Sequence, residues 1–326
     1  MTPRERTEQN ERRILSPYAT FADSTKGRER KEEPCPIRTA FQRDRDRIVH
    51  SKAFRRLKDK TQVFISAEDH YRVRLTHTME VMQIARTIAR ALGLNEDLTE
   101  AIALGHDLGH TPFSHAGEAT LNKIADCGFH HNAQSVRVVK YLEREGKGLN
   151  LTYEVLDGME NHRTENNPQT PEGQVVRLSD KIAYINHDVD DALRRGDLTE
   201  TDLPKECTDI LGHDVSSRIN TMIHNVLDFS ADGVVAMAGE VEKTTGQLRQ
   251  FLFERVYRTP DKLEKEVRVD RLITALFEYY MENPGSMPVE YEALCERFGR
   301  DRGVCDYIAG MTDHFAVETF TNIFVP

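Results

Sequence analysis

The spacing of the apolar side chains is the feature that most restricts how this chain can fold. Apolar residues recur at positions i, i+3, i+4 and i+7 throughout, whereas the alternation of β-branched residues that marks strands is scarce. A stripe with this spacing lies along one face of a helix, and it is buried when helices pack against each other. The sequence therefore predicts an all-α fold.

Two neighbouring helices are well marked. The first covers about residues 77–92, with His77 at the start of its apolar stripe and Gly93 placed to end it. The side chain of Asn95 can cap the second helix, which should stop near Gly109. Both helices could contribute to the core of a helical bundle.

A third helix is predicted near residues 175–194, and it has two different faces. One face is apolar and has core spacing. The other face repeats polar side chains at the same spacing, and these are Asp180, Tyr184, His187, Asp188 and Asp191. A second face this polar indicates a functional surface.

The chain of 326 residues divides into three predicted parts. Residues 1–40 contain mixed charges and a Pro-Cys-Pro stretch that disfavours helix, so we expect an N-terminal arm. Residues 41–215 hold the three helices described above and form the predicted core. Residues 216–326 are expected to form a C-terminal helical lobe.

Composition favours a soluble protein of the cytoplasm. The five cysteines form no CxxC pair, so they indicate reduced thiols rather than a disulfide framework or a zinc ribbon. The charged N-terminus is unlike a signal peptide, and no run of about 18 apolar residues could span a membrane. We therefore expect a cytoplasmic location and no membrane partner.

Charge is distributed unevenly along the chain. Residues 1–74 contain 19 Lys and Arg against 12 Asp and Glu, a net of +7, while the remaining residues contain 25 against 42, a net of −17. A basic segment beside an acidic body suggests a site for a polyanion, although a solvated helix face is the plainer interpretation of such charges.

Candidate metal ligands stand on the three predicted helices. His77, the adjacent His106-Asp107 pair and Asp180 could converge in a bundle core. Imidazole and carboxylate ligands suit Mn, Fe, Ni, Zn or Mg, and the spacing does not select one of them. The residues alone leave alternatives open, because the HD dipeptide also occurs elsewhere in the chain and a lone histidine on an apolar stripe is often a core residue.

Longer strings around these residues resemble a known family. They are FRRLKDKTQVF (54–64), RLTHTMEV (74–81), ALGHDLGHTPFSHAGE (103–118), HNAQS (131–135), EGQVVRLSDKIAYINHDVDDA (172–192) and VCDYIAGMTDHFA (304–316). Their H…HD…D pattern is similar to the signature of the HD phosphohydrolase superfamily. The strings resemble its deoxynucleoside triphosphate (dNTP) triphosphohydrolase branch, the dGTPase-like proteins, from about residue 38 to the end of the chain.

The resemblance implies a fold, an activity and a cofactor. The fold would be an HD-domain helical bundle. The activity would be the metal-dependent hydrolysis of a dNTP, with dGTP among the substrates, to deoxynucleoside and tripolyphosphate. The ligands of the divalent metal ion would be His77, His106, Asp107 and Asp180.

The resemblance also implies roles for the histidines that follow the HD pair. His110 would contact the α-phosphate region, and His115 would protonate the 5′-oxygen of the leaving group. Glu118 and His131 would orient or tune that acid. The chemistry is reasonable because a leaving alkoxide needs an acid and histidine titrates near neutrality. Loop capping or surface exposure is the alternative for His110 and His115.

Five further residues are implied to hold the substrate. Arg74 and Lys181 resemble contacts to the triphosphate, a role that suits both a planar guanidinium and a compact ammonium. Gln62 and Asp188 could hydrogen-bond a 3′-hydroxyl, and the ring of Tyr184 would exclude the 2′-hydroxyl of a ribonucleotide. A solvated charge is the alternative at Arg74, Lys181 and Asp188.

Two positions depart from the family pattern. His130 stands where family members often have an acidic residue, and His314 stands where they often have an arginine. The first departure concerns the proton relay, and the second concerns a contact at a lobe or subunit boundary. Neither involves a proposed metal ligand.

Other functions and partners stay open at this point. The chain could be another HD phosphohydrolase that acts on nucleoside monophosphates or phosphodiesters, or a nucleic-acid-binding regulatory protein. Related enzymes form homo-oligomers, so we expect one here. A nucleotide or a single-stranded nucleic acid could act as a regulator.

Overall fold

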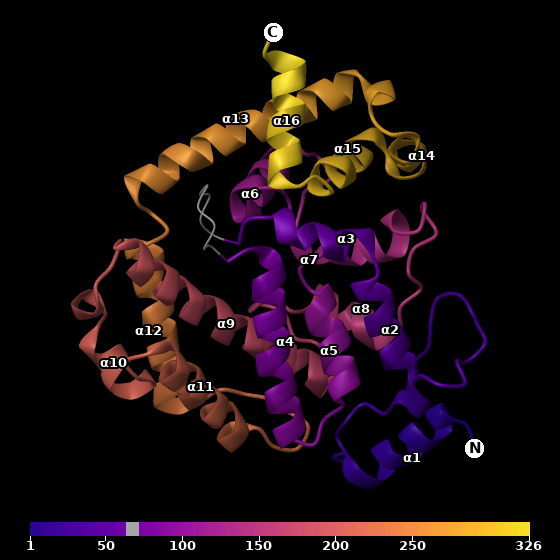
Figure 1. Ribbon diagram of the computed structural model, residues 1–326, viewed down its shortest axis with the longest axis vertical. Coiled ribbons are helices and arrows are strands. Elements are labelled where there is room, and N and C mark those ends of the chain that lie inside the picture. The colour runs from indigo at the N-terminus through magenta and orange to yellow at the C-terminus, as the bar shows by residue number, and fades with distance from the viewer. Residues whose placement is uncertain (63–71) are drawn as a thin grey trace. The chain divides into compact units, whose positions relative to one another are not determined.

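A computed structural model describes residues 1–62 and 72–326 of the chain (Figure 1). The regular backbone of these residues is helical and contains no β-strand, which confirms the predicted all-α fold. The last two residues of the FRRLKDKTQVF string, 63 and 64, lie outside the described residues. None of the described helices is both long and apolar enough to cross a membrane.

The described residues form 16 α-helices. Their bounds are α1 (Pro3–Ile14), α2 (Ala40–Val49), α3 (Lys52–Arg56), α4 (Arg74–Ala91), α5 (Glu96–Gly105), α6 (Ser114–Ile124), α7 (His131–Arg137), α8 (Tyr153–Glu160), α9 (Pro171–Arg195), α10 (Lys205–Leu211), α11 (Val215–Phe229), α12 (Gly239–Arg255), α13 (Pro260–Glu282), α14 (Val289–Phe298), α15 (Arg300–Ala309) and α16 (Asp313–Phe324). Short 3-10 turns lie at Ala22–Ser24, Leu57–Asp59, Glu200–Asp202 and Pro284–Ser286, and a π-helical segment covers Val138–Leu142.

The chain forms two compact units, and each is assembled from separate segments of sequence. Unit 1 comprises residues 1–46, 77–104 and 152–262, and unit 2 comprises residues 47–76, 105–151 and 263–326. The predicted division into an arm, a core and a lobe uses continuous stretches of sequence, whereas the compact units are defined by contacts between separate stretches. The division therefore stays a prediction.

The first two predicted helices are present as α4 and α5, but α5 ends at Gly105, so the His106-Asp107 pair lies in the turn after the helix and not on it as predicted. Gly93 follows α4 with φ of +68°, a left-handed conformation that glycine adopts without strain, and the amide of Leu94 donates to the carbonyl of Ala89. Asn95 caps α5, because its Oδ1 atom accepts a hydrogen bond from the amide of Leu98 at 3.2 Å. Both boundaries were therefore readable from local capping chemistry.

The third predicted helix is confirmed as α9, and it begins earlier than predicted. Pro171 occupies its first turn, and the hydroxyl of Thr170 accepts from the amide of Gly173 at 3.1 Å. Its apolar face is buried, with Leu178, Ile182, Ile185, Val189 and Ala192 at most 7 % exposed. One continuous helix consequently carries both Asp180 and Asp188.

Hydrogen bonds hold the N-terminal segment within unit 1. The amide and hydroxyl of Thr20 donate to the buried carboxylate of Glu172 at 2.9 and 2.7 Å. Glu154 likewise accepts from the hydroxyl of Thr25 and the amide of Lys26. Backbone that lacks helical partners is thereby satisfied by carboxylates of α8 and α9.

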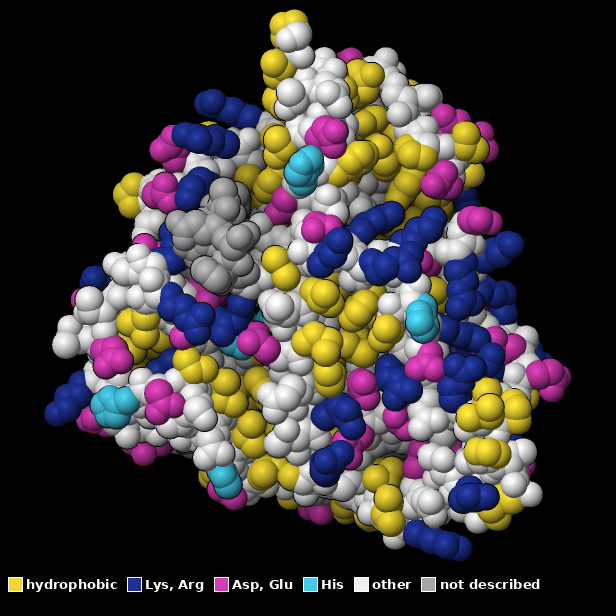
Figure 2. Space-filling model, viewed as in Figure 1, with side chains coloured by type: hydrophobic (Ala, Val, Ile, Leu, Met, Phe, Trp, Pro, Cys, Tyr) yellow, Lys and Arg dark blue, Asp and Glu magenta, His cyan; other side chains and the backbone are white. Residues whose placement is uncertain are grey.

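Unit 2 has an apolar core of its own, formed mainly by α6, α13, α15 and α16. Its buried members include Phe113, Leu121, Phe129, Ile273, Leu276, Val304 and Ile308. On the outside of this unit, the short helix α3 carries a group of lysines and arginines, which is visible as dark blue side chains in Figure 2. The basic character of the first quarter of the sequence is concentrated in part at this helix.

Candidate active site

The loop that follows α5 carries the first predicted site residues, and it is pressed against α7 within unit 2. A Cβ added at Gly109 would lie 2.2 Å from the backbone nitrogen of Ser135. The amide of Gly109 donates to the Ser135 hydroxyl at 2.9 Å, and this hydroxyl donates to the carbonyl of His106 at 2.7 Å. Only glycine allows this approach, which fixes the loop beside the helix that begins with His131.

The turn into α6 has an unusual backbone. Phe113 and Ser114 are consecutive residues with φ of 60° and 57°. These values lie in the left-handed region that residues other than glycine rarely adopt. The amide of Phe113 donates to Asp313 at 2.9 Å, and the hydroxyl of Thr111 donates to the carbonyl of Ser114 at 2.8 Å. The surrounding hydrogen bonds maintain a turn that costs conformational energy and that sets the direction of His115.

Asp107 is buried among basic groups of unit 2. Its Oδ1 atom lies 3.4 Å from Nε2 of His106 and 3.3 Å from Nε2 of His110, and Arg74 donates to Oδ2. Burial raises the pKa of this carboxyl, but its interactions with His106 and with the charge of Arg74 outweigh burial and hold the pKa well below its usual value. Asp107 is therefore a carboxylate, which is the form that binds a metal ion.

Arg74 is held by unit 2 itself. It is 1 % exposed, and apart from Asp107 it donates to the Ser114 hydroxyl at 2.7 Å and to the carbonyl of Gln62 at 3.2 Å. The side-chain Oε1 of Gln62 is buried and accepts no hydrogen bond from the described residues. Arg74 acts here as the counter-ion of Asp107, and its predicted contact with triphosphate stays a prediction.

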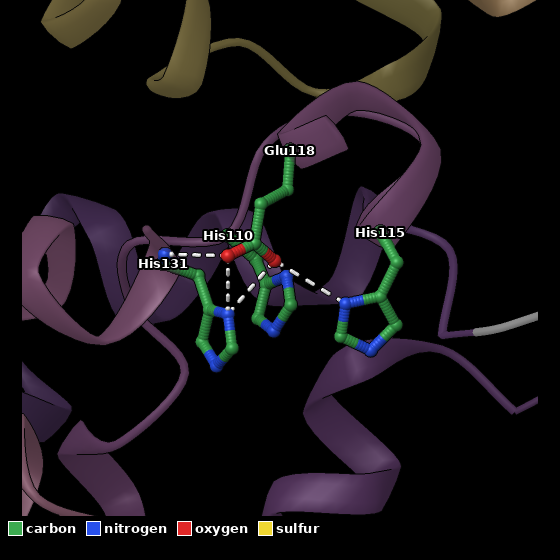
Figure 3. A group of neighbouring side chains, drawn as sticks. All are labelled: His110, His115, Glu118 and His131. Atoms are coloured by element: carbon green, nitrogen blue, oxygen red, sulfur yellow. Dashed lines mark hydrogen bonds and ion pairs between the residues drawn. The ribbon is translucent and has the colours of Figure 1, made fainter. Parts of the chain in front are cut away.

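Four of the predicted side chains meet around one carboxylate of unit 2 (Figure 3). Glu118 accepts hydrogen bonds from Nδ1 of His131 at 2.8 Å, from the amide of His131 at 3.0 Å and from Nδ1 of His115 at 3.2 Å. The ring of His110 stacks on the ring of His131, with centroids 4.0 Å apart and planes 15° apart. The structure thus brings together His110, His115, Glu118 and His131.

The protonation states in this cluster follow from its contacts. Burial raises the pKa of Glu118, but hydrogen bonds from His115 and His131 outweigh burial and hold the pKa well below its usual value. Burial also lowers the pKa of His110, and the charges of Arg74 and His131 lower it further. Glu118 is accordingly a carboxylate and His110 is neutral near pH 7. The side chain of His115 is 71 % exposed, so it is open to a ligand.

Lys60 is a site neighbour that sequence reasoning missed. It is 2 % exposed, and its ammonium donates to the carbonyl oxygens of His110 and Ala309, the second at 2.7 Å. Burial lowers the pKa of Lys60 to about 7. The residue lies in the FRRLKDKTQVF string, but that string contains four basic residues and nothing local separates a buried lysine from exposed ones.

In unit 1, α4 and α9 bring together two predicted metal ligands. Nε2 of His77 lies 3.1 Å from Oδ1 of Asp180. His187, one residue before Asp188 on α9, approaches Glu80 of α4 at 3.2 Å, and its ring meets the ring of His77 edge-on at 5.9 Å between centroids. His77 is buried and Asp180 is 21 % exposed, so this pair offers one imidazole and one carboxylate at a partly open position.

The predicted sugar face of α9 is completed by a tyrosine that sequence reasoning did not identify. Asp188 is buried and accepts a hydrogen bond from the hydroxyl of Tyr257, which follows α12. Burial raises the pKa of Tyr257, and the charge of Asp188 raises it further, so the hydroxyl keeps its proton. Lys181 and Tyr184 lie on the same helix, and burial lowers the pKa of Lys181 and raises that of Tyr184. Nothing in the sequence near Tyr257 signalled this contact.

The predicted site residues divide between the two units. Unit 2 holds eight of them, which are Gln62, Arg74, His106, Asp107, His110, His115, Glu118 and His131. Unit 1 holds five, which are His77, Asp180, Lys181, Tyr184 and Asp188. Their individual roles stay predictions.

The two departures from the family pattern are both exposed. The side chain of His130 is 57 % exposed and lies 3.9 Å from Glu118. The side chain of His314 is 86 % exposed and lies 3.8 Å from Glu318 on the same helix. His130 therefore borders the Glu118 cluster, whereas His314 contacts only its own helix among the interactions described for it.

The donor chemistry of these residues fits a divalent metal ion. Within unit 2, His110, His115, Glu118 and His131 offer ligand atoms that all lie within 4.8 Å of one another. Asp107 adds a carboxylate held ionised beside His106 and His110. Imidazole and carboxylate donors of this kind bind several first-row divalent ions and Mg²⁺, so the set does not identify the metal.

Comparison with protein families matches most of this architecture. Residues 74–185 match the HD domain, and residues 235–322 match the Phosphohydrolase-associated domain. The chain is therefore an HD-domain protein of the phosphohydrolase class.

Full-length relatives define the family more closely. The chain is 58 % identical over 329 residues to the deoxyguanosinetriphosphate triphosphohydrolase-like protein of Caldanaerobacter subterraneus, covering 100 % of this chain and 97 % of the relative. It is 51 % identical over 337 residues to the protein of the same name from Clostridium perfringens, covering 100 % and 98 %. A hypothetical protein from Aquifex aeolicus, of solved structure, aligns with 86 % of this chain and 71 % of its own, with a TM-score of 0.49 and 19 % identity. The chain belongs to the family of deoxyguanosinetriphosphate triphosphohydrolase-like proteins.

Proposed function

We propose that this protein hydrolyses deoxynucleoside triphosphates, dGTP among them, to deoxynucleoside and tripolyphosphate with the help of a divalent metal ion. The observation that carries the proposal is the Glu118 cluster, in which one ionised carboxylate holds two histidines by their Nδ1 atoms. Its chemistry suits the release of an alkoxide. The full-length identity to deoxyguanosinetriphosphate triphosphohydrolase-like proteins supports the choice of substrate.

The proposed metal ligands are the pair His77 and Asp180 and the pair His106 and Asp107, as the family resemblance implies. Each pair supplies one imidazole and one carboxylate, and Asp107 is held ionised by its surroundings. A divalent ion bound by such ligands would stabilise negative charge on the α-phosphoryl group and lower the pKa of a water molecule.

In this proposal His115 is the acid for the leaving group. Glu118 accepts from Nδ1 of His115, so Nε2 is the ring atom that can deliver a proton to the 5′-oxygen. A carboxylate at Nδ1 also fixes the tautomer of the ring. His131 is anchored to the same carboxylate, and the neutral, stacked His110 can hydrogen-bond a phosphate oxygen without adding charge.

The polar face of α9 would hold the triphosphate and the sugar. Lys181 would contact phosphate as a compact cation, and the ring of Tyr184 would pack against the 2′ carbon. Asp188 would accept from the 3′-hydroxyl, with Tyr257 holding its carboxylate in place. Gln62 would donate from its side-chain amide to the oxygen of the same hydroxyl, whose single proton goes to Asp188.

Product analysis tests this function directly. The protein is incubated with each dNTP and each NTP in Mn²⁺ or Mg²⁺, in water labelled with heavy oxygen, and the products are separated by chromatography. We expect deoxynucleoside and whole tripolyphosphate from dNTPs, with the label in tripolyphosphate, because water attacks the α-phosphorus and the 5′-oxygen leaves with the nucleoside. Release of dNMP with pyrophosphate, of orthophosphate alone, or of products only from monophosphates or phosphodiesters would refute the proposal.

The surroundings of the reaction are part of the proposal. We expect a cytoplasmic homo-oligomer, in keeping with the resemblance described above. A nucleotide or a single-stranded nucleic acid is expected to regulate it. Light scattering on the pure protein, with and without such ligands, measures the oligomer and its response.

A further inference from the structure

A cavity of about 220 Å³ lies within unit 2 and outside the cluster described above. Helix α3, the π-helical segment and α14 supply most of its wall. Leu108, Val138, Leu142, Leu294, Tyr141 and Tyr291 are its apolar and aromatic members. Small-molecule pockets usually measure about 300–1,000 Å³, so this cavity suits a ligand smaller than a nucleotide.

Four cations line the cavity, and they are Lys52, Arg56, Lys60 and Arg297. Among the interactions of the described residues, none of the four forms an ion pair with a carboxylate. Lys60 is the most informative of them, since it is 2 % exposed and its ammonium has three donors but donates only to two carbonyl oxygens. A buried ammonium without a carboxylate partner is costly, and either the loss of its proton or a bound anion relieves that cost.

Three glutamates also line the cavity, and they are Glu143, Glu145 and Glu290. Glu143 is committed elsewhere, because its two oxygens accept from the amides of Lys52 and Ala53 at 3.1 and 2.7 Å. Glu145 and Glu290 are exposed, as are Lys52 and Arg297, whereas Lys60 and Glu143 are buried. Around the cavity as a whole, the four cations outnumber the three glutamates, and the carboxylate of the buried Glu143 is already bound to backbone amides.

Aromatic rings beside the cavity also contact one of its cations, Arg297. The guanidinium of Arg297 lies 5.2 Å from the centroid of the Tyr141 ring and 4.7 Å from that of Phe298. Stacking of this kind holds the planar fork of an arginine in one orientation while leaving its N–H groups available to an anion.

We propose that this cavity is a second anion site, which binds the phosphate group of a small molecule through Lys60, Arg56 and Arg297. The planar forks of two arginines and a buried ammonium match the oxygens of a phosphate. The phosphate could belong to an inorganic oligophosphate or to a small phosphate ester whose organic part lies on the tyrosines. The site adjoins the active site, because Lys60 also donates to the carbonyl of His110.

Titration calorimetry on the full-length protein tests this site without measuring hydrolysis, so its outcome does not depend on the proposed function. The probes are inorganic phosphate, pyrophosphate and phenyl phosphate, in EDTA and at constant ionic strength set with chloride. We expect saturable binding of one anion per chain to the cavity. Pyrophosphate as the strongest probe would indicate an inorganic ligand, and phenyl phosphate as the strongest would indicate an ester.

Variants assign the binding to the cavity. Arg297→Ala and Arg56→Ala should each weaken binding by roughly tenfold or more, the effect of losing one charge-assisted contact. Arg271→Ala is the matched control, because Arg271 is exposed on α13 and does not line the cavity, and it should leave binding unchanged. Thermal melts verify that each variant is folded. No saturable binding, or binding that Lys181→Ala removes and Arg297→Ala does not, would overturn the proposal.

Discussion

The two units differ in how far their polar site residues are paired with other groups of the protein. In unit 2 the charged groups are compensated by protein partners, since Asp107 faces Arg74 and Glu118 binds two histidines. On α9 of unit 1, the interactions described include no hydrogen bond or ion pair to the side chains of Lys181 and Tyr184. The comparison indicates that the site side chains of unit 2 are already held in place by hydrogen bonds within the protein. On α9, in contrast, Lys181 and Tyr184 have polar groups that a bound ligand could pair with.

The largest expected effect distinguishes two of the proposed ligand carboxylates, Asp107 and Asp180. Asp107→Asn and Asp180→Asn should each abolish turnover and metal retention. Asp107→Asn should also lower the free energy of unfolding by about 3–5 kcal/mol, because it leaves the buried Arg74 without its charge partner. Asp180 is partly exposed, so Asp180→Asn should cost about 1 kcal/mol or less.

Metal analysis and urea unfolding of the two variants measure these effects. Equal losses of stability in the two variants would contradict the inferred difference between the units in how their carboxylates are paired. Full activity with unchanged metal content in either variant would remove that carboxylate from the ligand set.

The second effect concerns the organisation of the Glu118 cluster. Glu118→Gln keeps the shape of the side chain but removes the charge that holds His115 and His131, so kcat should fall by roughly 100- to 10,000-fold. KM should change little, because substrate contacts outside the cluster are intact. Steady-state kinetics with dGTP check this.

His130→Ala is the control for this variant. His130 is exposed and lies 3.9 Å from the same carboxylate, and we expect activity close to that of the unchanged protein. A loss in His130→Ala as large as that in Glu118→Gln would mean that the cluster extends to His130 and that its proton relay differs from the one proposed.

The third effect tests the α9 face. Tyr184→Ala should reduce the preference for dGTP over GTP in kcat/KM by roughly 10- to 200-fold, because the ring no longer closes over the 2′ position. Asp188→Ala should harm both nucleotides similarly by removing a shared contact to the 3′-hydroxyl. Kinetics of both variants with both nucleotides decide the matter, and an unchanged ratio in Tyr184→Ala would make its ring a packing residue only.

The smallest effect tests whether Tyr257 only holds Asp188 in place or contacts the sugar itself. Tyr257→Phe removes the hydrogen bond that Asp188 accepts and nothing else, so KM should rise by roughly fivefold for dGTP and GTP alike, the equivalent of about 1 kcal/mol. The kcat value should be kept. A changed dGTP/GTP ratio in this variant would instead place Tyr257 in contact with the sugar.

Sequence reasoning succeeded where the physical cause is local. The apolar spacing of α9 and the cap of Asn95 on α5 depend on residues within a turn or two of each other. The grouping of His110, His115 and Glu118 was also readable, since a loop and the first turn of α6 carry all three. The family strings extended this reading to His131, which a separate helix brings to the same carboxylate.

By itself, then, the sequence determined the helical class, the three marked helices and the identity of the chemical side chains, because periodicity and capping operate over one or two helical turns. Only the tertiary structure decided which groups neutralise one another. Arg74 meets Asp107 across 33 residues, Tyr257 meets Asp188 across 69, and Lys60 meets Ala309 across 249. Burial and pairing at such separations depend on how the whole chain packs, and no local pattern encodes them.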